Sequence, residues 1–316
     1  DLIIEAVFEN RDLKAKVTQE SEQFLNPNGI FASNTSTLPI TGLAEAASNP
    51  EKFIGLHFFS PVDKMPLVEI IKGEKTSDET IAKAFDFVLQ IKKTPIVVND
   101  SRGFFTSRVF GTFTNEGIAM LGEGQNPASI EKSALKAGMP VGPLAISDEV
   151  SLSLMAHIHT QTAKDLRAEG KAYKPHPSQA VVDHMIDIKR EGRAKGAGFY
   201  DYPKDNKKHL WQGLAKEFAE KPAIPFEDMK DRLLFIQALE TVRCLEEGVL
   251  NSVGDANIGS IFGIGFAAWT GGAIQFINQY GVKKFALRSL ELAKKYGDRF
   301  NPPQLLLNKA ETGSLF

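Results

Sequence analysis

Residues 1–33 have the sequence DLIIEAVFENRDLKAKVTQESEQFLNPNGIFAS, in which two short apolar runs flank a longer mixed run. Leu2–Val7 and Ile30–Ser33 are the apolar runs, and their length and composition are typical of buried strands. Arg11–Phe24 has the spacing of a helix, and Asn26-Pro27-Asn28-Gly29 follows it as a turn. A strand, a helix and a second strand in this order predict parallel strands joined by a crossover helix.

The alternation continues to about residue 100, so we expect a mostly parallel sheet with helices on its faces. Three more strands are expected at Phe53–Phe59, Leu67–Ile71 and Thr94–Asn99, with helices at Ile40–Ala47 and Asp78–Gln90. After Asp100 no further strand is expected, and a long helix is predicted at Phe104–Gly122. The expected fold class is therefore α/β followed by all-α.

The helical half contains an internal repeat at an offset of 124 residues. Five positions are identical at this offset: Arg108, Glu116, Leu121, Glu123 and Gly124 match Arg232, Glu240, Leu245, Glu247 and Gly248. Five identities at one offset favour a duplicated helical domain, which resembles a dimer interface fused into one chain. The domains expected are 1–100 for the sheet, 101–202 for the first helical copy, 203–228 for a connector and 229–316 for the second copy.

The composition excludes several classes of protein. A chain of 316 residues with 42% hydrophobic residues and a net charge of −2 is typical of a globular protein, without the basic character of nucleic-acid binding. The longest uncharged stretch, 256–282, is too rich in glycine to be a membrane span. A single cysteine, Cys244, excludes an internal disulfide and fits a reducing compartment.

One expected feature of a dinucleotide-binding sheet is missing. The glycine-rich loop G-x-G-x-x-G, which follows the first strand of such domains, does not occur in the chain. Either this is not such a domain, or the loop lies upstream of Asp1. Because the chain opens within a strand pattern, we expect a partial Rossmann-type sheet without its first strands, impaired in NAD binding by itself.

Three polar residues lie among apolar, strand-like neighbours: Ser36, His57 and Glu69. A histidine beside a carboxylate is kept in one tautomer and is stabilised when protonated, as a general base requires. Structural roles are the alternatives: a core histidine, a solvent-facing glutamate on an edge strand, and a serine that caps the helix after Leu38. No spacing of histidine, cysteine and acidic residues indicates a metal site.

The blocks around these residues are similar to those of the L-3-hydroxyacyl-CoA dehydrogenase family, especially the dehydrogenase part of the multifunctional α subunit of the fatty-acid oxidation complex. The blocks are Ile4–Asn10, Ser33–Ser36, Gly55–Val62, Pro66–Ile71, Asn99–Phe105, Gly196–Tyr200 and Asp255–Gly259. The resemblance implies that His57 is the catalytic base and that Glu69 orients it. It further implies that Ser36 contacts substrate and nicotinamide.

The resemblance also implies substrate and cofactor contacts elsewhere. Ser107 occupies the position of a family asparagine that binds the reacting oxygen of the substrate, and a serine has a shorter reach. Glu9 and Lys14 match positions near the ribose and nicotinamide of NAD, and the alternative for both is an ordinary solvated helix start. Ser60 replaces an asparagine or serine that faces the nicotinamide.

The resemblance implies oxidation of (3S)-3-hydroxyacyl-CoA to 3-ketoacyl-CoA with NAD, in fatty-acid β-oxidation. It implies an upstream enoyl-CoA hydratase domain and a thiolase β subunit as partners. The expected location is the cytoplasm in a bacterium, or mitochondria or peroxisomes in a eukaryote. Two alternatives stay open: a non-catalytic module that docks a thiolase subunit, and a related dehydrogenase of free hydroxy acids.

Overall fold

A computed structural model describes residues 1–316, and the chain divides into two compact units. One unit comprises residues 1–110 and 238–316, and the other comprises residues 111–237. The boundaries fall inside two long helices, α4 (Thr106–Gly122) and α10 (Phe226–Glu246), so each helix contributes residues to both units. The four-part division expected from the sequence stays a prediction.

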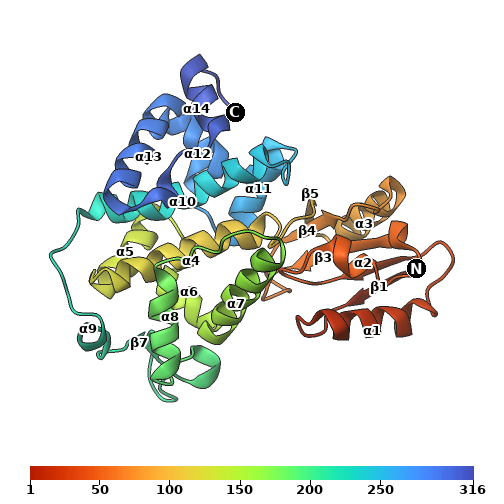
Figure 1. Cartoon of the computed structure of the whole chain (residues 1–316), viewed down its shortest axis with the longest axis horizontal. Helices are drawn as coiled ribbons and strands as arrows, with labels where there is room; N and C mark the ends of the chain where they lie inside the picture. The colour runs from red at the N-terminus through yellow and green to blue at the C-terminus, as the bar shows by residue number, and fades with distance from the viewer. The chain divides into compact units, whose positions relative to one another are not determined.

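The first unit contains a five-stranded sheet in which the strands occur in chain order (Figure 1). The strands are β1 (Leu2–Glu5), β2 (Ile30–Ser33), β3 (Phe53–Phe58), β4 (Leu67–Lys72) and β5 (Thr94–Asn99). Strands β1, β2 and β3 are parallel, β4 is antiparallel to β3, and β5 is parallel to β4. The sheet is thus parallel at its start, as predicted, and reverses direction once.

The two faces of this sheet differ in what covers them. Helix α3 (Asp78–Gln90) packs on the face that carries Leu56, Val68 and Ile70. Side chains alternate between the two faces along a strand, so Gly55 and every second residue from it on β3 lie on the opposite face. There, α2 (Ile40–Ala44) approaches so closely that a Cβ on Gly55 would lie 2.8 Å from the Ile40 side chain.

Several element ends differ from those predicted, because backbone groups find other partners. Strand β1 ends at Glu5, whose carboxylate accepts the Val7 amide. Helix α1 (Arg11–Glu22) ends two residues before its predicted end. Helix α2 ends at Ala44, and the predicted residues after it form only turns with hydrogen bonds between residues three apart. Helix α4 begins at Thr106 because Gly103 and Phe104 have left-handed φ angles of 72° and 51°.

Helices are the main elements of the rest of the chain. The first unit also contains a short 3₁₀ turn, η1 (Pro50–Lys52), and after α10 it comprises α11 (Val253–Ile264), η3 (Ala268–Thr270), α12 (Ala273–Tyr280), α13 (Val282–Tyr296), η4 (Asp298–Phe300) and α14 (Gln304–Thr312). The second unit contains α5 (Pro127–Ala137), α6 (Pro143–Val150), α7 (Leu152–Ala168), α8 (Ser178–Asp187), η2 (Arg193–Lys195) and α9 (Leu214–Glu217).

The expectation of no strand after Asp100 is wrong at one place. Two-residue strands, β6 (Tyr200–Asp201) and β7 (His209–Leu210), form an antiparallel pair in the second unit. Strands of this length have no alternation that a sequence pattern could reveal. Buried Asp148 holds the backbone at the start of β6 in place, since its carboxylate accepts hydrogen bonds from the amides of Phe199 and Tyr200 at 2.9 Å.

The repeated residues form two matching sets of ion pairs, one in each unit. In the first unit, Arg108 donates to Glu240 and Glu247. In the second, the fully buried Arg232 donates to Glu116 and Glu123, which are the counterparts of those two glutamates at the offset of 124. Each arginine therefore pairs with the glutamates of the other repeated set, as a two-fold contact between the two expected copies would produce.

Candidate active site

His57 and Glu69 lie directly opposite each other on strands β3 and β4. Residues opposite in an antiparallel pair project to the same face, so the strand register alone brings the two side chains together. His57 Nδ1 is 2.9 Å from Glu69 Oε2. Glu69 is 0% exposed and His57 is 6% exposed, so the pair lies almost entirely out of water. The residues before and after each of the two on their strands point the other way, into the apolar core under α3. This is why His57 and Glu69 stand among apolar residues in the sequence.

The carboxylate of Glu69 is fixed by the beginning of α4. Oε1 accepts the amides of Phe105 at 3.0 Å and Thr106 at 3.1 Å, and Oε2 accepts the Thr106 hydroxyl at 2.5 Å. Amides at a helix N-terminus have no partner inside the helix and favour negative charge. This arrangement offsets the unfavourable burial of the carboxylate and leaves Oε2 aimed at His57.

The second ring nitrogen of His57, Nε2, has no hydrogen-bond partner in the chain. Because the carboxylate of Glu69 accepts a hydrogen bond from the Nδ1–H group, the neutral ring carries its free lone pair on Nε2. The Phe59 ring lies 4.5 Å from the imidazole and the Phe104 ring 6.2 Å, measured between centroids. A base with one nitrogen fixed, the other free and aromatic rings beside it is suited to proton transfer at Nε2.

The loop that contains Ser36 follows β2 and reaches the same edge of the sheet. Asn34 Oδ1 accepts the amide of Phe58 at 2.9 Å, which ties this loop to the end of β3 beside His57. The carbonyl of Thr37 accepts the Gly103 amide, which ties the loop to the turn before α4. The Ser36 hydroxyl itself is exposed and has no partner in the chain. Thus Ser36 is free to bind a ligand.

Ser36 does not cap a helix. Helix α2 has Pro39 at its N-cap, and its first amides, on Ile40 and Thr41, are accepted by the carboxylate of Asp100 at 2.9 and 2.7 Å. That structural alternative is therefore excluded.

Glu9 has a specific role in the fold, which a solvated helix start does not require. Its Oε1 accepts the amides of Ser36 at 2.7 Å and Thr37 at 3.2 Å, and the Thr35 hydroxyl donates to both carboxylate oxygens. The side chain stays 23% exposed. Glu9 thereby orders the backbone on either side of Ser36, at the carboxyl ends of β1 and β2 where ligands bind in open α/β sheets.

Lys14 is buried to 1% exposure, and its ammonium group is bound within the protein. Nζ donates to both oxygens of Glu5 and to the Val7 carbonyl, each at 3.1 Å, and lies 3.7 Å from Glu9 Oε2. Ser33 also donates to Glu5. Lys14 thus stabilises the strand end and the Glu9 carboxylate, and its ammonium does not project into solvent.

Ser60 and Ser107 complete the residues predicted from the sequence. Ser60 is exposed just after β3, and Ser107 is half-buried in the first turn of α4, next to Thr106. Neither hydroxyl has a partner in the chain. Ser107 therefore lies one residue from the group that fixes Glu69, with its hydroxyl available to a ligand.

The sequence predictions missed the residues that order the site. Thr106, Asn34 and Asp100 each bond to a backbone or side chain far away in the chain, at separations of 37, 24 and 60 residues. Short polar residues in turns are common, so no local pattern distinguishes them.

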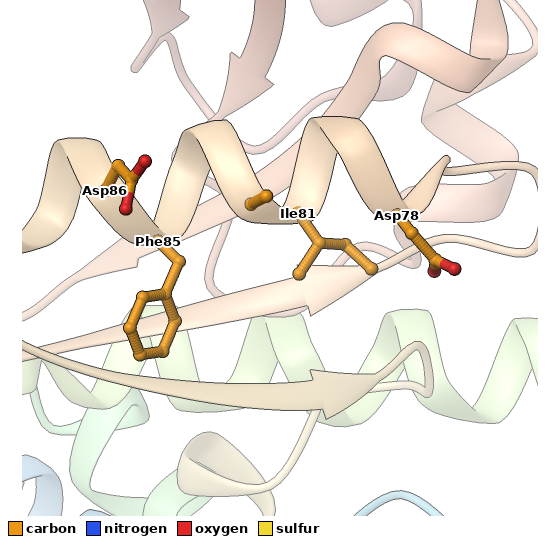
Figure 2. Close-up of a pocket in the computed structure, with 5 residues that line it drawn as sticks. Asp78, Ile81, Phe85 and Asp86 are labelled. Carbon is orange, nitrogen blue, oxygen red and sulfur yellow. The ribbon is translucent and has the colours of Figure 1, made fainter.

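A surface hollow elsewhere in the first unit is unrelated to the pair. It lies on α3 and is lined by Asp78, Ile81, Ala82, Phe85 and Asp86 (Figure 2). Since α3 covers the face opposite His57 and Glu69, this hollow is not the candidate site.

Comparison with known proteins matches both parts of the chain to one family. Residues 1–101 match the NAD binding domain of 3-hydroxyacyl-CoA dehydrogenase, and residues 103–202 match its C-terminal domain. The chain belongs to the 3-hydroxyacyl-CoA dehydrogenase family. This family consists of oxidoreductases, and the first 101 residues are part of its NAD-binding domain.

Relatives and solved structures agree with this assignment. The chain is 42% identical, over its whole length, to the fatty acid oxidation complex subunit alpha of Shewanella amazonensis, of which it spans 44%. The dehydrogenase part of multifunctional enzyme 1 from C. elegans has a TM-score of 0.66 at 26% identity, covering 98% of this chain and 71% of that one. A 3-hydroxybutyryl-CoA dehydrogenase from Escherichia coli has a TM-score of 0.79 over 99% of this chain and 81% of that one, and at 22% identity shows the fold alone.

No group of histidine, cysteine and acidic side chains is arranged to bind a metal ion. No helix combines the length and apolar character that crossing a bilayer requires.

Proposed function

We propose that this chain is the dehydrogenase part of a fatty-acid oxidation α subunit and oxidises (3S)-3-hydroxyacyl-CoA to 3-ketoacyl-CoA. The observation that carries the proposal is the buried His57–Glu69 pair with a free Nε2. Nε2 accepts the proton of the substrate hydroxyl, and Glu69 stabilises the imidazolium that results. Proton transfer by such a base contributes on the order of 10²–10⁴ in rate.

The residues present fit a bound nicotinamide cofactor. The exposed hydroxyl of Ser36 lacks an internal partner, and Glu9 orders the backbone beside it. We assign Ser36, Glu9 and Ser60 to direct contact with NAD, and Lys14 to support through Glu9, since its ammonium group is buried. NAD, when bound, supplies the acceptor for the hydride.

Ser107 is proposed to bind the reacting oxygen of the substrate, directly or through one water. Its free hydroxyl lies in the first turn of α4, the same turn that fixes Glu69. A hydroxyl donates one hydrogen bond, so this contact does not depend on an asparagine.

The partners and location are proposed from the similarity to these relatives. Proteins named as α subunits of a fatty acid oxidation complex match this chain, which supports a multidomain complex. We propose an upstream enoyl-CoA hydratase domain, a thiolase β subunit as partner, and a cytoplasmic location in a bacterium.

The test uses the full-length protein that contains this chain. We expect it to reduce NAD with (3S)-3-hydroxybutyryl-CoA, and we expect His57→Gln to lower that rate by at least about 100-fold while hydratase activity is retained. The hydratase rate is the control for folding. A folded His57→Gln protein that keeps about a tenth of the wild-type rate would contradict the general-base role.

A further inference from the structure

Thr106 is the one side chain besides His57 that forms a hydrogen bond with Oε2 of Glu69. Its hydroxyl donates to Oε2 at 2.5 Å, the same oxygen that lies 2.9 Å from His57 Nδ1. The hydroxyl oxygen is itself 3.5 Å from Nδ1. Two polar groups, one from β3 and one from α4, therefore meet at a single carboxylate oxygen on β4.

We propose that Thr106 is a positioning residue that sets both the orientation of Glu69 and the charge that Glu69 offers to His57. The inference rests on the proposed function, because it concerns the same proton transfer. A donor to Oε2 stabilises the carboxylate as an anion. It also withdraws part of the negative charge from the oxygen that stabilises imidazolium, so the Thr106 hydroxyl competes with His57 Nδ1 for that oxygen.

The position of Thr106 is fixed from behind by α11. A Cβ on Gly263 would lie 3.3 Å from Thr106 Cγ2 and 2.6 Å from Leu67 Cδ2, so this glycine permits α11 to approach the site closely. Because Thr106 is 0% exposed and its methyl group lies near α11, the hydroxyl is directed at Glu69 and away from solvent. The backbone amide of Thr106 bonds to Oε1, so one residue binds both oxygens of the carboxylate.

The ionisable groups on the helices beside the Glu69 carboxylate are neutral or already paired, so they do not replace the hydrogen bond from Thr106. From α10, Cys244 lies within electrostatic range of Glu69, and burial raises the pKa of its thiol, which therefore stays neutral. On α4, Arg108 follows Thr106 by two residues and is paired with Glu240 and Glu247. From α11 the approach is made by Gly263, which has no charge.

The test compares pH profiles of dehydrogenase kcat/KM in the full-length protein. Oxidation requires neutral His57, so the rate falls on the acid side as the imidazole becomes protonated. Thr106→Val removes the donor at constant shape, and we expect the acid limb to move to higher pH by about half a unit to one unit. We expect Thr106→Ser, which keeps the hydroxyl, to retain the position of the wild-type limb.

Thr80→Val is the matched control. Thr80 is equally buried in the same unit, and its hydroxyl donates to the Glu51 carbonyl on α3's side of the sheet, so this variant loses a hydrogen bond without moving the limb. A Thr106→Val profile that coincides with the wild type, or moves to lower pH, overturns the inference. So does a Thr106→Ser profile shifted as far as that of Thr106→Val.

Nitrogen-15 NMR titration of the His57 ring gives a readout that needs no turnover. If Thr106→Val does not fold, Thr106→Ala is titrated instead, with the same upward shift expected. A wild-type protein without dehydrogenase activity would refute the proposed function, while this titration would still decide the role of Thr106.

Discussion

Replacing Glu69 by glutamine tests whether the carboxylate acts by fixing one tautomer of His57. The wild-type side chain accepts four hydrogen bonds, two from backbone amides at Oε1, and two from Thr106 and His57 at Oε2. Glutamine has one oxygen and one NH₂ group for these positions. Turning the NH₂ toward the amides would leave two buried donors unpaired, at about 1–3 kcal/mol each. We therefore expect the oxygen to stay with the amides of Phe105 and Thr106.

In that orientation the NH₂ group of glutamine faces His57 Nδ1, so Nδ1 must accept a hydrogen bond instead of donating one. The ring proton then resides on Nε2, which can no longer act as a base. We expect kcat to fall by about 10²–10⁴. The free energy of unfolding should fall by only about 1–2 kcal/mol, because charge-assisted hydrogen bonds become neutral ones but few are lost.

The assay is the initial rate of NAD reduction in the full-length protein, together with urea denaturation. Glu131→Gln is the matched control, because Glu131 is also a buried glutamate that accepts a backbone amide, from Leu144, and a hydroxyl, from Tyr200. It should lose stability without a comparable loss of rate. A folded Glu69→Gln protein with more than about a tenth of the wild-type kcat would refute the tautomer argument.

Two further predictions concern stability. Arg232→Ala removes the arginine paired with the fully buried Glu116 and should lower the free energy of unfolding by about 3–5 kcal/mol. Arg108 has 18% side-chain exposure, so Arg108→Ala should have a smaller effect. Equal losses of stability for the two variants in urea denaturation would argue against burial as the cause. Burial raises the pKa of Asp148, so the folded protein binds this proton more tightly than the unfolded chain does. The resulting stabilisation is full below the unfolded pKa of about 3.9 and is lost as pH rises through the raised folded value. The wild type should therefore lose stability over this window relative to Asp148→Asn, and parallel curves for the two proteins would count against the linkage.

The strands and helices of the first hundred residues could be predicted from local pattern. Ile30–Ser33, Asp78–Gln90 and Thr94–Asn99 have the predicted bounds, because apolar spacing and capping residues are local properties. His57 and Glu69 could also be recognised as candidate site residues, since both polar side chains interrupt apolar strands and lie in blocks similar to one family.

How those residues are arranged becomes visible only in the folded chain. The reversal of β4 places Glu69 opposite His57, and a strand direction depends on the whole sheet instead of on the sequence of one strand. The contact of Thr106 with Glu69 spans 37 residues, and the approach of Gly263 spans a further 157. The amino-acid order specifies which chemical groups are present and on which elements they lie. Their hydrogen bonds, and hence which nitrogen of His57 is free, depend on distant segments meeting in space, which no local pattern encodes.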